Sequence, residues 1–267
     1  MFVLKKKGSV EYFAVTVWNA YPAITHAFCT RRGGISAAPY ASLNMSRKEG
    51  EAEANVSANW DIAAAAFGLA GGQFFRISQV HGEGILVIDG EGFRSPTGRP
   101  PEYDAVITNR PGLALCILTA DCVPVLMFDR AKRVVAAVHA GWRGTALNIS
   151  GQVATLFRER FRSRPEDLLA AVGPAIGPCC YEVDESVYGA MAGHPHRDEL
   201  FSPQVPAGRW KLDLPLANRR QLEEAGIPGE NICTANLCTS CHRGLFFSHR
   251  GEGGTTGRLL NFIMWNG

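Results

Sequence analysis

The chain has 267 residues, of which 46% are hydrophobic and 19% charged, the composition of an ordinary folded protein and not of a disordered one. Its formal net charge is only +2 and the basic residues are scattered, which argues against a nucleic-acid-binding surface. The longest apolar stretches are far shorter than the roughly 18 residues of a membrane helix, and no signal peptide is evident. We therefore expect a soluble, cytoplasmic protein whose eight cysteines are reduced and which binds no membrane.

The first half of the chain predicts short strands around one helix. Residues 10–18 alternate and are rich in aromatic and β-branched side chains, which indicates a strand, and residues 51–67 predict a helix that ends at Gly68. Two further strands are predicted on either side of the polar turn at residues 79–82. They cover residues 73–77 and 84–88, and the densest strand signal follows at 105–108, 113–118, 123–128 and 134–138.

The second half alternates helices and strands. A glycine-rich turn at residues 141–144 precedes a predicted helix at 145–161. The remaining elements are strands at 168–172, 245–248 and 259–264 and helices at 184–191 and 213–225. This mixture predicts an α/β fold, a single domain over residues 1–267 with one large mixed β-sheet layered with helices.

Three reactive side chains follow or end predicted strands in glycine- or proline-bearing segments. They are His81 in QVHG, Cys122 in TADCVPV and His139 in VHAGWRG. Strand ends at one edge of a sheet converge, and two imidazoles with one thiolate suit a zinc ion that keeps one coordination position open for catalysis. The spacing also fits a simpler interpretation, in which the histidines are polar surface residues and the cysteine is a small core side chain.

The same segments resemble the laccase-domain family, also called multicopper polyphenol oxidase-like proteins and described as purine nucleoside phosphorylases. The matching strings run in order along most of the chain: AFCTRRGGIS, ASLN, QVHG, YDAVIT, TADCVPV, AVHAGWRG, GPAIGPCCYEV and FFSHRGEGGTTGR. The resemblance implies a fold similar to the deamidase domain of cytotoxic necrotizing factor. It also implies zinc bound by His81, Cys122 and His139, and phosphorolysis of adenosine, inosine, guanosine or methylthioadenosine with adenosine deamination as a side activity. Family patterns commonly have Tyr and Arg where this chain has His249 and Gly251.

Phosphorolysis requires a phosphate site, and arginines in glycine-bearing segments are the candidates. We expect one or two of five to bind phosphate, although any single one is better explained as a solvated or paired surface residue. The five are Arg31, Arg32, Arg143, Arg250 and Arg258, and the predicted substrate-binding residues are Arg31, Asn44, Arg143 and Arg250. Asp121 is predicted to be catalytic or to orient a metal-binding histidine. The partners are expected to be nucleoside and phosphate, and the protein a monomer or homodimer.

Two other enzyme classes use similar residues. Copper is a less favoured metal, because a multicopper oxidase needs many His-x-His pairs and the chain has seven histidines with one such pair, His194 and His196. A cysteine hydrolase or deamidase would instead use Cys122 as nucleophile and His139 as base. A third alternative is a protein that binds nucleotides or redox partners without turnover. About one zinc per chain would favour the phosphorylase, and a metal-free enzyme inactivated by thiol alkylation would favour the hydrolase. Ligand binding without turnover would favour the third alternative.

The remaining cysteines form two groups. Cys233, Cys238, Cys241 and His242 have the spacing C-x4-C-x2-C-H, which fits a second metal site but lacks a matching downstream pair, so free or buried thiols are favoured. Cys179 and Cys180 are adjacent, which is poor geometry for a disulfide between them. They are interpreted as packing or pocket-wall residues.

Overall fold

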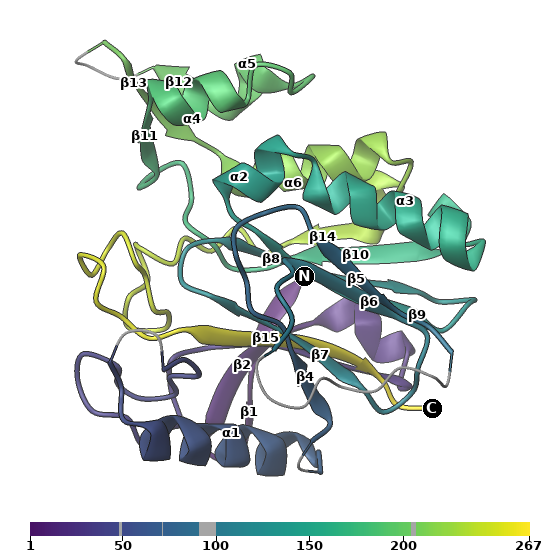
Figure 1. Ribbon diagram of the computed structural model, residues 1–267, viewed down its shortest axis with the longest axis vertical. Helices are drawn as coiled ribbons and strands as arrows, with labels where there is room; N and C mark the ends of the chain where they lie inside the picture. Colours follow the sequence, from purple (N-terminus) through teal and green to yellow (C-terminus); the bar gives the residue numbers. More distant parts are fainter. Residues whose placement is uncertain (48–49, 71, 91–99, 204–206) are drawn as a thin grey trace.

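The strands of this protein form two six-stranded mixed sheets, and helices cover the outer face of each (Figure 1). The computed structural model describes residues 1–47, 50–70, 72–90, 100–203 and 207–267. The first sheet has the order β1 (Phe2–Lys7), β2 (Val10–Val15), β3 (Ile24–Cys29), β15 (Leu259–Trp265), β7 (Ala114–Thr119), β4 (Phe74–Arg76). The second has the order β14 (Ile232–Thr234), β10 (Leu168–Val172), β8 (Val123–Asp129), β9 (Val134–Ala140), β6 (Ala105–Thr108), β5 (Ile85–Ile88).

Three hydrophobic layers hold these elements together. Side chains of both sheets, such as Leu115 and Phe128, meet in the central layer. Helix α1 (Glu53–Phe67) packs on the outer face of the first sheet. Helices α3 (Ile149–Phe161) and α6 (Leu214–Glu224) pack on the outer face of the second sheet. The strands of the second sheet are therefore covered on both faces, which explains their almost continuous apolar sequences.

Smaller elements lie at one end of the molecule, beyond helix α2 (Trp142–Ala146) (Figure 1). They are a three-stranded sheet of β11 (Glu182–Asp184), β13 (Arg209–Leu212) and β12 (Phe201–Pro203), with α4 (Glu185–Ala190) and α5 (Arg197–Leu200). Three 3-10 turns complete the described elements: Thr16–Ala20, Pro165–Asp167 and Gly229–Asn231.

The predicted α/β class is confirmed, but two sheets replace the single large sheet that was expected. Strand patterns identify strands and not their partners, so the division between sheets was not visible. The predicted helix at 145–161 is split, because Asn148 has a left-handed backbone (φ 61°) between α2 and α3. The predicted strand at 245–248 is wrong: it is a turn in which Phe246 and Phe247 are buried, so packing and not strand pairing explains its aromatic run. Strands β1, β3 and β11 to β14 were not predicted.

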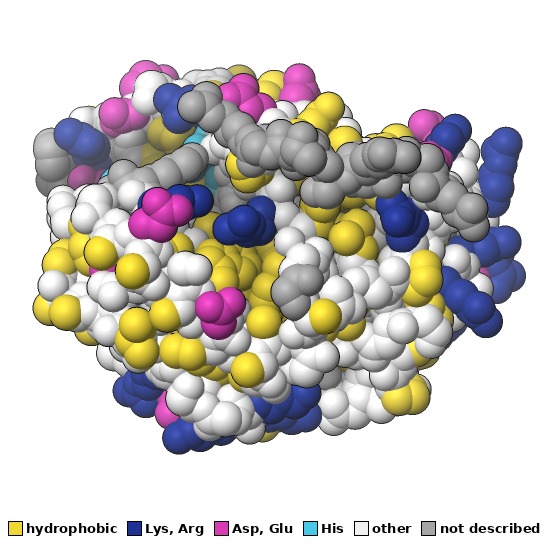
Figure 2. All heavy atoms as spheres, turned by 60° about the horizontal axis from the view of Figure 1, so that its bottom comes forward, with side chains coloured by type: hydrophobic (Ala, Val, Ile, Leu, Met, Phe, Trp, Pro, Cys, Tyr) yellow, Lys and Arg dark blue, Asp and Glu magenta, His cyan; other side chains and the backbone are white. Residues whose placement is uncertain are grey.

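The described part of the chain has no helix suited to a bilayer, and the basic side chains on one of its faces are dispersed. Among the described residues, no helix combines the length and apolar character needed to cross a bilayer. On the face drawn in Figure 2, the described Lys and Arg side chains form small groups separated by hydrophobic and uncharged atoms. That the protein binds no nucleic acid stays a prediction.

Candidate metal centre and pocket

The three predicted ligands come together at one end of the two sheets. Antiparallel pairing of β8 with β9 places Pro124 opposite His139, so Cys122 lies beside the last residues of β9. The turn between β4 and β5 brings His81 to the same place. The ligand atoms of His81, Cys122 and His139 all lie within 4.8 Å of one another, and the two imidazole rings meet edge to face. His139 is only 2% exposed whereas His81 is exposed, so the group is open on one side.

Asp104, which precedes β6, orients both histidines. Its Oδ1 accepts a hydrogen bond from Nδ1 of His139 at 2.8 Å and from the backbone N–H of His81 at 3.0 Å, and its Oδ2 accepts from the N–H of Gly82 at 2.7 Å. Burial raises the pKa of Asp104, but its hydrogen bonds to His139 and Gly82 outweigh burial and lower it. A carboxylate at this position fixes the proton of His139 on Nδ1 and leaves Nε2 to face Cys122.

The backbone of His81, and that of Asp121 next to Cys122, lies in the left-handed region that favours glycine. His81 has φ 60° and Asp121 has φ 89°. Residues other than glycine rarely adopt this conformation, and such strain persists where the surrounding contacts enforce it. For His81 one such contact is the hydrogen bond from its backbone N–H to Oδ1 of Asp104, which holds the turn that carries the imidazole.

The charges of Cys122 and His139 stabilise each other. Burial raises the pKa of Cys122, but the charge of His139 and the hydrogen bonds from His139 and His81 lower it to about 6. Burial lowers the pKa of His139, whereas the charge of Cys122 and the bond to Asp104 raise it to about 9. Without a metal, the pair is therefore a thiolate and an imidazolium near neutral pH, and the thiolate is already in the form that binds metals.

Alkylation of the metal-free protein tests this ionisation state. The rate of Cys122 modification by iodoacetamide should be nearly constant above about pH 7 and fall as the pH drops through about 6, because the thiolate is half protonated at its pKa of about 6. In His139→Ala the inflection should move upward, since the stabilising charge is lost. Peptide mass spectrometry over a pH series measures both profiles, and an inflection above about pH 8 in the wild type would contradict the ion pair.

Gly141 is the residue that leaves room for the three ligands. A Cβ at Gly141 would lie 3.1 Å from Cδ2 of His81 and 3.2 Å from Sγ of Cys122. Its φ of −72° is open to any residue, so the constraint is steric.

Gly141→Ala should therefore lower metal affinity and activity severalfold while it changes the unfolding temperature little. Calorimetric metal titration and thermal unfolding measure the two effects. Gly189→Ala is the matched control, since a Cβ there meets nothing within 4 Å, and it should preserve affinity. Equal metal affinity in Gly141→Ala and the wild type would refute the steric argument.

The three ligand residues line a cavity of about 440 Å³, a size that suits a small molecule. Apolar and aromatic side chains form part of its wall, among them Leu118, Trp142, Ile176 and Tyr181. Burial and the negative charge of Cys122 raise the pKa of Tyr181 to about 12, so its phenol stays protonated. The cavity thus combines flat apolar surface with a hydroxyl donor beside the candidate metal centre.

Arg143, Arg250 and Arg258 line the same cavity. Arg143 lies over the ring of Trp142, 4.2 Å from its centroid, and among the described residues its guanidinium has no hydrogen-bond or ion-pair partner. Arg250 donates through Nη1 to the carbonyl of Glu182 at 2.7 Å, and Arg258 donates to the carbonyls of Thr256 and Gly257. The donors of Arg143 are therefore the most available for an anion.

Asp121 lies in the cavity lining, but its carboxylate is engaged. Oδ1 accepts from the hydroxyl of Thr239 and Oδ2 from the backbone N–H of Arg250, both at 2.6 Å. These bonds tie the segment that carries Arg250 to the residue next to Cys122. The structure thus places Asp121 as a support for the cavity wall.

Two predicted substrate-binding residues lie outside the cavity lining. Asn44 is fully buried, and its Oδ1 accepts from the backbone N–H of Ser46 and of Arg258. Arg31 pairs with Glu252 and stacks over Phe247. Both side chains instead link loop segments of the chain to one another.

Sequence reasoning did not single out Asp104, Gln79, Trp142 and Tyr181. All four stand inside the quoted motifs. Gln79, Trp142 and Tyr181 line the cavity and Asp104 supports the histidines from outside it, but nothing in a motif shows which way a side chain points. His249, noted only as a departure from the family pattern, also lines the cavity.

Two histidines and a cysteine thus form a candidate metal centre at the edge of a small-molecule cavity, on a core of two packed β-sheets. The family model described as multi-copper polyphenol oxidoreductase laccase matches residues 25–266, and the chain belongs to this family.

Relatives and solved structures agree with this assignment. The purine nucleoside phosphorylase YlmD of Geobacillus stearothermophilus is 38% identical over 88% of this chain and 87% of its own length. The purine nucleoside phosphorylase YfiH of Escherichia coli is 34% identical over 93% and 97%. Crystal structures of YlmD from G. stearothermophilus (34% identity, 100% of both chains) and of Bacillus licheniformis YfiH (36%, 98% of both) each superpose with a TM-score of 0.90. Relatives with this name support an enzyme of the purine nucleoside phosphorylase kind.

Proposed function

We propose that this protein is a zinc-dependent purine nucleoside phosphorylase. It converts adenosine, inosine, guanosine or methylthioadenosine and phosphate to the free base and ribose 1-phosphate, and it deaminates adenosine as a side activity. One observation carries the proposal: His81, Cys122 and His139 converge at the edge of a cavity that also presents the guanidinium of Arg143, which has no ion-pair partner among the described residues. The names of the relatives support the same reaction.

The donor set fits zinc. Imidazole and thiolate ligands suit a borderline-soft ion, and three protein ligands leave one position for water or substrate. When bound, such an ion supplies Lewis-acid polarisation and lowers the pKa of a bound water to about 7. Copper fits less well, because the described residues hold one group of two histidines and a cysteine. Elsewhere, the ring of His196 pairs with Glu199 and Glu224, and Nδ1 of His194 accepts from the backbone N–H of His196.

The cavity residues account for the other requirements of phosphorolysis. The reaction breaks the bond between the base and C1′ of the ribose, and a phosphate oxygen forms the new bond to C1′ while the electron pair leaves with the base. We assign phosphate binding to Arg143, because a guanidinium offers paired donors to an anion and this one lines the cavity. Trp142 and Tyr181 offer ring surface and a hydroxyl to the nucleoside. The base takes a proton as it departs, for which the Tyr181 phenol is a candidate donor.

Arg143→Gln should raise the KM for phosphate at least tenfold and leave adenosine deamination unchanged. A hydrogen bond to a charged group contributes about 1.5–3 kcal/mol, which corresponds to roughly a tenfold to hundredfold change in affinity. Initial rates over a phosphate series measure the effect. Arg158→Gln on the exposed face of α3 is the control and should behave as wild type. An unchanged phosphate KM in Arg143→Gln would remove Arg143 from the phosphate site.

The defining experiment incubates the purified chain with adenosine, with and without phosphate. We expect adenine and ribose 1-phosphate only when phosphate is present, and inosine in both cases. The same assay with inosine, guanosine and methylthioadenosine ranks the bases. Binding without any product would contradict the proposal and favour a protein that binds nucleosides without turnover.

The thiolate–imidazolium pair of Cys122 and His139 supports a second candidate, a cysteine hydrolase or deamidase. This candidate leaves His81 without a role, although its imidazole completes the metal-ligand group. About one zinc per chain at this group together with phosphate-dependent turnover favours the phosphorylase. Metal-free enzyme that alkylation of Cys122 inactivates would favour the hydrolase.

A further inference from the structure

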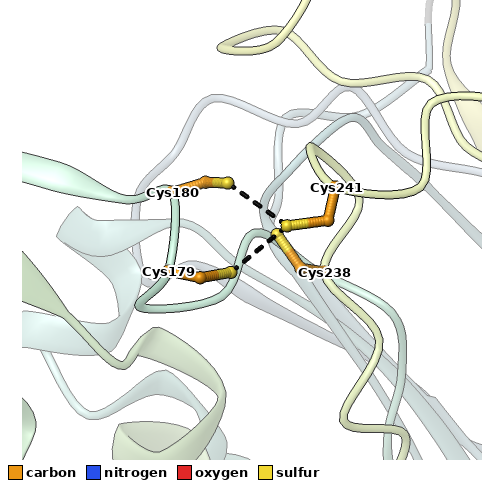
Figure 3. Close-up of side chains that lie close together, drawn as sticks. All are labelled: Cys179, Cys180, Cys238 and Cys241. Carbon is orange, nitrogen blue, oxygen red and sulfur yellow. Dashed lines mark hydrogen bonds between the residues drawn. The ribbon is translucent and has the colours of Figure 1, made fainter.

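A second group of four cysteines lies outside the metal centre described above. Cys179 and Cys180 come from the loop after β10, and Cys238 and Cys241 from the loop before β15. Figure 3 shows the four side chains pointing toward one another from these two loops. Their sulfur atoms all lie within 4.8 Å of one another, although about sixty residues separate the pairs in the chain.

The sulfur positions match the geometry of a tetrahedral thiolate site. Sγ of Cys241 lies 3.5 Å from that of Cys179 and 3.4 Å from that of Cys180. A tetrahedron with Zn–S distances of about 2.3 Å has sulfur–sulfur edges of about 3.8 Å, whereas a disulfide bond is about 2.05 Å long. Four sulfurs around one point are a ligand set without an open position, which is typical of structural zinc.

The backbone around the cysteines supports the same function. Cys238 and Cys241 form a C-x2-C turn, the usual spacing of a zinc-binding pair. The N–H of Gly177 donates to Sγ of Cys238 at 3.3 Å, and the N–H of Cys180 bonds to the carbonyl of Gly177, which turns both adjacent cysteines toward the same centre. Hydrogen bonds of this kind orient the ligands of metal sites. Cys233 and His242 are not part of the group; the ring of His242 bonds instead to the carbonyl of Cys238.

We propose that Cys179, Cys180, Cys238 and Cys241 bind a structural zinc ion, separate from the candidate catalytic centre. The ion links two loops that both reach the cavity: Tyr181 follows Cys180, and the second loop carries Arg250. A cross-link there fixes the wall of the cavity without contact with the substrate. The second pair of ligands for Cys238 and Cys241 therefore lies upstream in the chain, at the adjacent residues Cys179 and Cys180.

Metal analysis of the full chain, purified under reducing conditions without added metal, tests the proposal. We expect about two zinc ions per chain in the wild type and one fewer in the double variant Cys179→Ser, Cys241→Ser. Cys233→Ser is the matched control and should keep both ions. His81→Ala should lose only the other ion, so the count in this background reports on the four cysteines independently of any nucleoside turnover.

A titration that needs no cysteine variant covers the case in which the double variant fails to fold. In the His81→Ala protein, a mercurial reagent should release the remaining zinc as the four thiols react, and a cobalt-substituted sample should show the absorption of a four-thiolate site. Free reaction of these thiols without metal release would overturn the proposal. A disulfide between the two loops under reducing conditions would also overturn it. So would iron or copper, in place of zinc, as the metal ion that remains in His81→Ala.

Discussion

Replacing His81 with alanine should abolish both phosphorolysis and deamination and remove one metal ion from the protein. His81 supplies one of three ligand atoms within 4.8 Å of one another, and two remaining ligands hold an exchangeable ion far more weakly. Loss of the several kcal/mol that a metal contributes to a transition state corresponds to a rate below about one thousandth of wild type. Product formation from adenosine with phosphate, together with metal content, measures the effect.

His196→Ala is the matched control for this variant. His196 pairs with Glu199 and Glu224 outside the cavity lining, so its loss should leave metal content and turnover unchanged. Because His81 is exposed at a turn, its removal should also leave the fold intact. Normal turnover in a folded His81→Ala protein would refute a metal-centred reaction.

Asp104→Asn should weaken metal binding at this centre about 10- to 100-fold, with a matching loss of kcat/KM. The carboxylate accepts hydrogen bonds from the ring of His139 and from the backbone at His81 and Gly82, and an amide cannot reproduce all of them. Asp104 does not touch the candidate ion, so it is a positioning residue. Calorimetric titration of the metal-free protein with zinc measures the affinity directly.

Asp129→Asn separates this effect from general destabilisation. Asp129 is equally buried and accepts hydrogen bonds from the backbone N–H groups of Ala131 and Lys132, at the opposite end of β8 from Cys122. Both variants should lose roughly 1–3 kcal/mol of stability, but only Asp104→Asn should lose metal affinity. Equal affinities in the two variants would show that Asp104 acts on folding alone.

The family description and the relatives' names point to different chemistries, and the site distinguishes them. A multicopper oxidase needs several histidine-rich copper sites, and the described residues contain the His81–Cys122–His139 group and the four cysteines. The phosphorylase names agree better with a single open centre beside an arginine-bearing cavity. The expected similarity to the deamidase domain of cytotoxic necrotizing factor stays a prediction.

The sequence by itself determined most local structure and the identity of the three candidate ligands. The predicted strands at 105–108 and 168–172 match β6 and β10. Short apolar runs bounded by turn residues are too short for a helix and favour a buried strand. His81, Cys122 and His139 were found from strand ends and from their family motifs. These signals depend on residues that are neighbours in the sequence, so they can be recognised without the tertiary structure.

Only the tertiary structure decided which distant segments meet. It divided the strands into two sheets, placed Asp104 beneath both histidines, and moved Arg31 and Asn44 out of the cavity lining. It also joined Cys179 and Cys180 to Cys238 and Cys241, which the sequence treated as unrelated thiols. The physical reason is that contacts between loops depend on how packed sheets orient their ends, and side-chain type alone does not encode that orientation.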